Sequence, residues 1–222
     1  SGKQHLDFLG SADLRAPGAR RGTLLLDPSS IDIGATADLN GDNTPGDDLV
    51  APSLTLADFA GAASSITATR VATLLSTTNV TLAADNQITV SAPVTVTAGV
   101  AASTLSLTSP SIAVRAAMTL NNSSLALDTG GGVSDSITIG APIQSLGSVS
   151  LTASNVSIGD VITTQQLNLS SPANQSATVT EDSAVGGIVA SGVTAQAVGD
   201  AIMSLSLTSA LNRIGSLTLG HV

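Results

Sequence analysis

Short segments in which aliphatic and polar residues alternate recur along most of this chain of 222 residues. The first unit is Gly22–Gly34, GTLLLDPSSIDIG, in which two such segments, at residues 24–26 and 31–33, flank an Asp-Pro pair and two serines. Alternation with a period of two predicts a β-strand with one buried face, and Asp-Pro-Ser-Ser predicts the turn that joins two strands. Units of this kind bury their apolar side chains only when they pack on one another.

The unit recurs clearly from Thr78 onward, and the opening strands of successive units lie about 18–25 residues apart. This period is typical of repeat proteins. No unit contains a helix long enough for the crossover of a wound α/β fold. We therefore predict an all-β fold, a right-handed parallel β-helix in which the aliphatic side chains of successive coils stack inward, among them Leu107, Val149 and Leu151. An antiparallel β-sandwich is the alternative, but its Asn-Gly hairpin signal occurs only at Asn40-Gly41.

The predicted organisation has two parts. Residues 1–21 form a lead-in or cap, in which Ser1-Gly2 has the composition of a tag remnant. Residues 22–222 form a single β-helix, with an acidic loop insertion at residues 35–49 that is rich in Asp, Asn, Gly and Pro. We expect the whole to be an internal fragment of a longer chain.

Two stretches depart from the repeat. Residues 57–75 carry a helical pattern, with Asp58 as a candidate N-cap and Ile66 in the apolar face, so we expect one short helix or an extra-helical loop near residues 35–75. Residues 182–203 look irregular because they are rich in glycine and other small residues. Leu205 and Leu207 then reopen the strand pattern.

The composition excludes several classes of function. The net charge of −9 argues against nucleic-acid binding, which needs clustered Lys and Arg for the phosphates. No apolar run reaches the length of a membrane-spanning helix. The absence of cysteine excludes disulfides and thiolate metal sites. Aromatic residues make up only 1% of the chain, so the core must be built from Val, Ile, Leu and Ala.

Several segments resemble the two-partner-secretion exoproteins, the family of filamentous haemagglutinin-like adhesins. The most specific is the Gly-Thr-Leu-Leu-Leu-Asp-Pro block of Gly22–Pro28 with its following Ile-x-Ile strand. Weaker similarities cover most of residues 76–219: Thr78–Ala84, Asn86–Val90, Leu105–Leu107, Ile112–Val114 and Asn212–Ile214.

This resemblance implies a non-catalytic structural stalk of a large secreted adhesin. Such a stalk is exported unfolded through a dedicated outer-membrane partner and lies on the cell surface of a Gram-negative bacterium, or is released from it. It presents a binding or effector region to a receptor or glycan on a host or bacterial surface. The parent chain is an adhesin, a haem-scavenging exoprotein or the stalk of a contact-dependent toxin.

The one candidate metal site lies in the acidic loop. Asp38, Asn40 and Asp42 place oxygen ligands at alternate positions, with Asp47 and Asp48 behind them, as at the start of a calcium loop. Asn43 stands where such a loop has glycine, and Leu49 stands where it has its bidentate acid. These departures favour a solvated acidic loop, with calcium as the alternative cofactor.

Other candidates have a structural explanation that we favour. The Asn-x-Ser/Thr sequences, such as those at Asn79 and Asn174, suit β-helix corners as well as glycosylation. Arg15, Arg20 and Arg21 suit a solvated loop as well as a glycan, and Glu181-Asp182 suits a turn.

A carbohydrate-active β-helix enzyme, a lyase or a hydrolase, is the alternative function. Its carboxylates would gather on one face, whereas Asp85, Asp128, Asp135 and Asp160 are spread over different units and no Trp or Tyr offers a sugar platform. An ice-binding β-helix would need Thr-x-Thr on every coil, and here it recurs only irregularly. We expect no enzyme activity.

Overall fold

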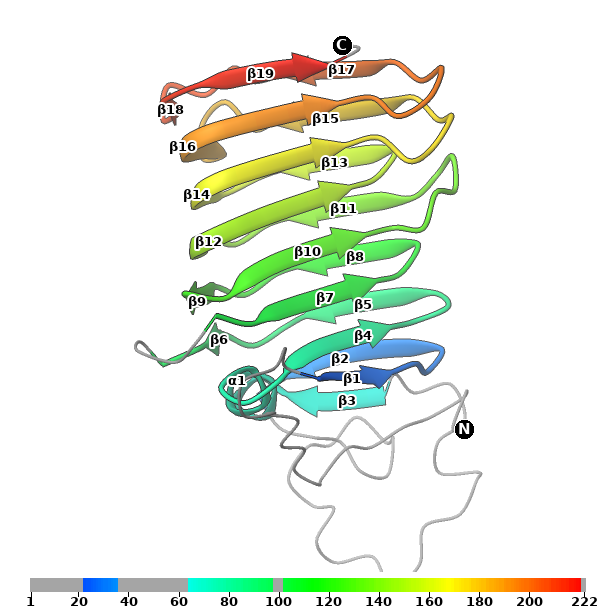
Figure 1. Ribbon diagram of the computed structural model, residues 1–222, viewed down its shortest axis with the longest axis vertical. Helices are drawn as coiled ribbons and strands as arrows, with labels where there is room; N and C mark the ends of the chain where they lie inside the picture. The colour runs from blue at the N-terminus through cyan, green and yellow to red at the C-terminus, as the bar shows by residue number, and fades with distance from the viewer. Residues whose placement is uncertain (1–21, 36–63, 98–101, 221–222) are drawn as a thin grey trace, which may run out of the picture.

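The computed structural model describes residues 22–35, 64–97 and 102–220. In these residues the fold is mostly β, with two parallel sheets and one short helix. The strands stack along the long axis of the molecule, from β1, β2 and β3 at one end to β17, β18 and β19 at the other (Figure 1). Every pairing between described strands is parallel, which confirms the prediction of parallel β-structure and excludes the antiparallel sandwich.

The first sheet has eleven strands among the described residues, eight of them in the order β1-β4-β7-β10-β12-β14-β16-β18. Outside this path, β19 pairs with β16, while β6 pairs with β9 and β9 with β12. The strands are β1 Thr23–Leu26, β4 Asn79–Ala83, β6 Val94–Thr95, β7 Thr104–Thr108, β9 Met118–Asn121, β10 Ser124–Asp128, β12 Ile143–Thr152, β14 Val161–Ser170, β16 Gly187–Gln196, β18 Arg213–Ile214 and β19 Leu217–Gly220.

The second sheet has eight described strands in the order β17-β15-β13-β11-β8-β5-β2-β3. Its strands are β2 Ser30–Gly34, β3 Ser64–Thr67, β5 Gln87–Val90, β8 Ser111–Val114, β11 Ser136–Ile139, β13 Asn155–Ile158, β15 Ala177–Glu181 and β17 Met203–Ser206. From β4 onward the chain visits the two sheets alternately, so each repeat adds one strand to each sheet.

The strand register confirms the predicted repeat length. Partner residues in the first sheet form the series Val80, Leu105, Leu125, Val149, Leu167, Val193 and Leu217. Successive members are 25, 20, 24, 18, 26 and 24 residues apart. In-register parallel pairing therefore places equivalent residues of neighbouring repeats side by side, about 4.8 Å apart.

The core consists of aliphatic ladders between the two sheets. Leu107, Val149 and Leu151, predicted to point inward, are all 0% exposed. Each fully buried side chain of this kind stabilises the fold by about 1.5–3 kcal/mol through the hydrophobic effect. The same ladder positions are refilled by Leu, Val or Ile from repeat to repeat, which explains how a chain with two phenylalanines and no tryptophan or tyrosine builds a continuous core.

Buried hydroxyl groups line one edge of this core, where the chain enters the first sheet. The Ser103 and Ser123 hydroxyls share a hydrogen bond of 2.8 Å, and the Ser145 hydroxyl donates to the Ser123 carbonyl over 2.8 Å. The Thr164 hydroxyl donates to the Gly147 carbonyl in the next repeat over 3.0 Å. All three serines are at most 4% exposed, so the bonds offset the cost of burying polar groups. The sequence analysis did not predict this feature.

The helix α1 spans Ala68–Leu75, within the predicted region but shorter than the pattern of residues 57–75. Its N-cap is Thr67, whose side chain accepts from the Arg70 N–H over 3.1 Å. The predicted N-cap Asp58 lies outside the described residues. Placing Ile66 on the helix was wrong, because residues 64–67 form β3 and pair with β2.

The position of β3 interrupts the order of stacking. It lies on the far side of β2 from β5, at the end of the second sheet. The chain thus steps back to the end of the molecule after β2, and α1 leads it to β4 next to β1 (Figure 1). Val71, Leu74 and Leu75 of α1 are buried against the core, so the helix covers apolar side chains that strands cover elsewhere.

The prediction that residues 182–203 are irregular was wrong. Gly187–Gln196 forms β16, one of the longest strands, which pairs with β14 along its whole length. Its buried positions include small residues, Ala190 and Ala195, which weaken the apolar alternation in the sequence. Leu205 consequently belongs to the second sheet, in β17, and does not open a new repeat.

Candidate functional site

The predicted calcium loop and the arginine cluster lie outside the described residues. Asp38, Asn40, Asp42, Asp47 and Asp48 all fall within residues 36–63, and the three arginines fall within residues 1–21. The calcium site therefore stays a prediction. Within residues 22–35, 64–97 and 102–220, no three His, Cys, Asp or Glu side chains are grouped so that they could hold a metal ion.

The described aspartates serve the turns between strands. The Asp128 carboxylate accepts from the Gly130 N–H over 2.9 Å, and the Asp160 carboxylate from the Val161 N–H over 2.7 Å. The Asp135 carboxylate accepts from the Gly132 N–H over 2.5 Å. Aspartate favours turns because its side chain can bind nearby backbone N–H groups in this way. Each carboxylate is thus engaged in its own turn, as a structural role requires.

Glu181 differs from these aspartates because it enters the core. It pairs with Ile158, which is 0% exposed, and so continues an inward ladder. Its Oε2 accepts from the Ser209 N–H over 3.1 Å and from the Asn212 Nδ2 over 2.9 Å. Its Oε1 is buried without a hydrogen-bond partner. The prediction of a turn at Glu181-Asp182 therefore holds for Asp182 but was wrong for Glu181.

Asp32 is the one described group with a clearly shifted pKa. It lies half-buried in β2, between the buried residues Ile31 and Ile33. Burial raises the pKa of the Asp32 carboxyl above its ordinary value, while the hydrogen bond from the Ser91 hydroxyl, 2.8 Å long, and the charge of Arg115 oppose the rise. Ser91 and Arg115 follow β5 and β8, so this contact joins three repeats of the second sheet.

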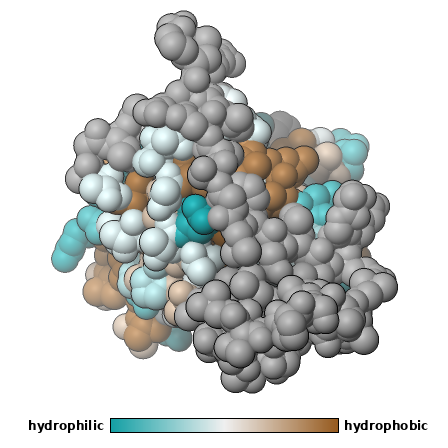
Figure 2. All heavy atoms as spheres, turned by 90° about the horizontal axis from the view of Figure 1, so that it is seen from below, coloured by the Kyte–Doolittle hydropathy of each residue, from teal (hydrophilic) through white to brown (hydrophobic). Residues whose placement is uncertain are grey.

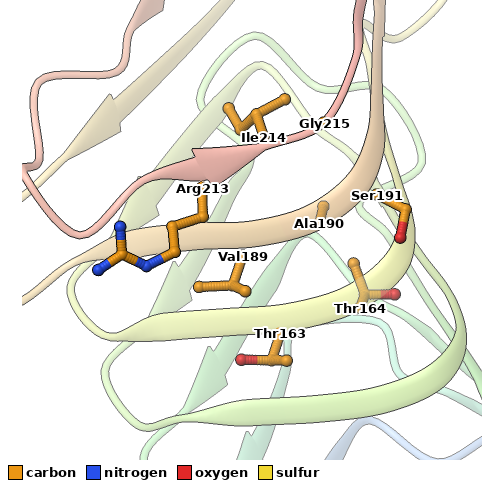
Figure 3. Close-up of a pocket in the computed structure, with 8 residues that line it drawn as sticks. All are labelled: Thr163, Thr164, Val189, Ala190, Ser191, Arg213, Ile214 and Gly215. Atoms are coloured by element: carbon orange, nitrogen blue, oxygen red, sulfur yellow. The ribbon is translucent and has the colours of Figure 1, made fainter.

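The hollow shown in Figure 3 is the best candidate for binding a small molecule. It is shallow, has a volume of about 490 Å³, and lies over β14, β16 and β18. Strand register places Thr163, Val189 and Arg213 side by side along it. The Arg213 guanidinium extends away from Thr164 and Ser191, which lie at the opposite side (Figure 3). The full lining is Thr163, Thr164, Val189, Ala190, Ser191, Arg213, Ile214 and Gly215.

The chemistry of this hollow is limited. Arg213 supplies one positive charge, and Thr163 and Ser191 supply hydroxyl groups. The Thr164 hydroxyl is already engaged with the Gly147 and Gln166 carbonyls, over 3.0 and 3.3 Å. The lining contains no carboxylate, histidine or other general base, and these residues can therefore contact an anionic or hydroxylated group but cannot carry out acid–base catalysis.

A second hollow of about 470 Å³ lies beside α1. It is lined by Thr69, Ala72, Thr73, Ser76, Pro93, Thr95 and Thr97. These residues carry hydroxyl and methyl groups but no charge, so they give no indication of a particular ligand. Figure 2 views the molecule from the end that carries α1 and β3. Pale side chains of intermediate hydropathy border hydrophobic patches there.

Asparagines in glycosylation-type sequences hold the corners of the repeats. Asn79 Oδ1 accepts from the Thr104 N–H over 2.9 Å, and Asn155 Nδ2 donates to the Asp135 carbonyl over 3.2 Å. Asn121 and Asn174 adopt left-handed backbone conformations, with φ of 46° and 58°. Asparagine tolerates this conformation better than most residues, which supports the structural explanation of these positions.

No protein-family model, curated protein or solved structure matches this chain. The resemblance to two-partner-secretion exoproteins therefore stays an expectation from the sequence. Among the described residues, no helix is long and apolar enough to cross a membrane.

Proposed function

We propose that this chain is a segment of a right-handed parallel β-helix and serves as a non-catalytic stalk of a large, adhesin-like exoprotein secreted by a Gram-negative bacterium. The observation that supports this best is the unbroken series of aliphatic partner residues from Val80 to Val193, each at most 1% exposed. A body whose repeats contact mainly their neighbours is extended and resists bending, as a spacer must.

The distribution of polar groups agrees with a spacer. The outward positions next to the ladder carry Thr81, Ser106, Ser150, Asn168 and Thr194, which are neutral. The charged aspartates sit at the turns instead. Serine and threonine on the faces keep the strands solvated, and threonine also suits an extended backbone. No described face gathers the carboxylates and cations that catalysis on a glycan would need.

The architecture also suits export in an unfolded state. A fold stabilised by contacts between adjacent repeats can form repeat by repeat as a chain emerges from a pore. Its stability depends on no disulfide, since the chain contains no cysteine. We propose an outer-membrane partner as the pore and a surface receptor or glycan as the target of the region that the stalk carries.

Distance measurements between spin labels would test the spacer role. The chain has no cysteine, so Thr81→Cys/Thr194→Cys and Ser106→Cys/Thr194→Cys variants can be labelled cleanly. Thr81 and Thr194 lie in one outward column and are five strand pairings apart, which corresponds to about 24 Å. We expect narrow distributions that differ by about one strand spacing, about 4.8 Å, between the two pairs. Broad distributions, or equal distances, would contradict a stiff spacer.

Incubation with polyanionic glycans would separate a stalk from an enzyme. We expect the full chain to release no new reducing ends from pectin or related polymers. Depolymerisation that is abolished by substituting one described carboxylate would support the carbohydrate-active alternative and overturn the stalk.

A further inference from the structure

The β17–β19 end of the molecule exposes side chains that are buried in every repeat below it. Leu217 pairs with Val193, and Leu219 pairs with Ala195. Val193 and Ala195 are 1% and 0% exposed, whereas Leu217 and Leu219 are 49% and 52% exposed. The two leucines therefore occupy core positions of the ladder that have no neighbour on one side.

The backbone of β19 is also half unpaired. The Ser216 and Gly220 carbonyls accept from the Val193 and Ala197 N–H groups of the β16 segment, over 2.8 and 3.1 Å. In a parallel pair, alternate residues direct their N–H and C=O groups to the same neighbour. The groups of Leu217 and Leu219 consequently point to the opposite edge, with which no described strand pairs. Apolar side chains and hydrogen-bonding groups are thus presented together.

This edge lacks the features that prevent strands from associating. Natural edge strands are protected by Lys, Pro, bulges or inward-pointing charges. Residues 203–220 contain no Lys, Pro, Asp or Glu, and Arg213 is their one charged residue. In a chain of net charge −9, this is a segment on which two copies can meet without repulsion between carboxylates.

We propose that the β17–β19 end binds a second copy of this chain, with β19 antiparallel to β19 of the partner. A two-fold axis brings two identical edges together and closes the assembly as a dimer. Thr218 then lies opposite Thr218 of the second copy, and the backbone groups of Leu217 face those of the other Leu219. Residues 203–220 approach the 20–30 residues that each partner contributes to a stable interface.

Sedimentation of the full chain over a range of concentrations tests the association. We expect a monomer–dimer equilibrium that Leu217→Lys/Leu219→Lys shifts at least tenfold toward monomer. The matched control is Val133→Lys/Leu146→Lys, which adds the same charge at apolar residues that are 80% and 53% exposed on other parts of the surface. Circular dichroism of each variant separates loss of association from loss of fold.

A cysteine crosslink tests the arrangement. Opposed residues of a non-hydrogen-bonded antiparallel pair have Cα atoms about 4.5 Å apart, within the range of a disulfide. Thr218→Cys should therefore form a disulfide dimer under mild oxidation, whereas Thr194→Cys, one repeat deeper in the same column, should not. A monomer at all concentrations overturns the proposal, as does an open-ended series of oligomers or equal crosslinking of both variants.

Discussion

Glu181 occupies the ladder position that Ile158 holds one repeat earlier. A carboxylate at a core position is tolerated because it accepts hydrogen bonds from the Ser209 N–H and the Asn212 side chain. Asn212 Oδ1 in turn accepts from the Ile188 N–H over 2.7 Å. Glu181 therefore ties the turn before β18 to both β15 and β16, where the aliphatic ladder of the second sheet gives way to polar contacts.

We expect Glu181→Ala to loosen the last repeat while leaving the earlier repeats folded. Loss of the acceptor leaves two donors unpaired at a cost of about 1–3 kcal/mol. The exchange of the Ser209 amide proton should accelerate by about tenfold or more, with little change in β7 to β13, because repeats depend mainly on their neighbours.

Asp182→Ala is the matched control for Glu181→Ala. The exposed Asp182 carboxylate binds only the Ala184 N–H of its own turn, over 2.9 Å. Its removal should leave the exchange of Ser209 unchanged. Unchanged exchange at Ser209 in Glu181→Ala as well would contradict the role assigned to Glu181.

Leu151→Asp tests the inward assignment of the first-sheet ladder. Leu151 is 0% exposed between Leu127 and Leu169. A carboxylate there loses the packing of the leucine and is buried without a partner, so we expect a loss of more than about 3 kcal/mol in unfolding free energy. Ser150→Asp, on the neighbouring outward position, should change the free energy by less than about 1 kcal/mol. Similar losses from the two variants would show that the faces are assigned wrongly.

The buried hydroxyl pair should show strong coupling. Ser123→Ala leaves the Ser103 hydroxyl buried without its partner, at a cost of about 1–3 kcal/mol, and Ser103→Ala has the converse effect. The double variant removes both groups, so we expect it to cost less than the sum of the single variants. A double-mutant cycle on urea unfolding measures this difference. Strict additivity would indicate that the two hydroxyls do not interact.

The shifted pKa of Asp32 predicts a pH dependence of stability. The folded state binds this proton more tightly than the unfolded chain, whose pKa is near 3.8. The stabilisation is therefore fully present below that pH and is lost as the pH rises through the higher pKa of the folded state. Asp32→Asn should gain stability relative to the parent chain as the pH is raised from 3 to 7, as measured by denaturation at each pH.

Asp85→Asn is the control for this pH effect, because Asp85 is an exposed corner residue of the same face of the repeat array. It removes the same charge. If the two variants follow the same pH profile, the burial of Asp32 has no measurable effect on stability.

The regular part of the fold was predictable because its chemistry repeats. Leu105, Leu125 and Val149 stand at equivalent places in successive units, and alternation alone assigns each of them to the core. The same rule failed at β16, where Ala190 and Ala195 occupy core positions with side chains too small to register as an apolar pattern. It also failed at β3, because position along the sheet is decided by tertiary pairing with β2 and not by local sequence.

The candidate sites were less predictable for a different reason. Glu181 follows the alternation of Ala177 and Val179, and this phase would have placed it inward. Its polar character suggested a turn instead, because its partners Ser209 and Asn212 lie about 30 residues further along the chain. The hollow at Arg213 likewise depends on residues from three strands, which only the stacked register brings together.

Removal of one whole repeat tests the central claim most directly. Deleting residues 124–147, one period of 24 residues, places Val149 on Leu105 and Leu151 on Leu107. The same deletion places Ile162 on Met118. Every ladder stays filled with aliphatic residues. Deleting only residues 124–135 places a second-sheet strand against the first sheet.

Thermal unfolding followed by circular dichroism distinguishes the two deletions. The account predicts that the whole-repeat deletion folds cooperatively and melts within a few degrees of the parent chain, whereas the half-repeat deletion loses the strands that follow it. Unfolding of the whole-repeat deletion, or equal stability of the two, would contradict an architecture of interchangeable stacked repeats.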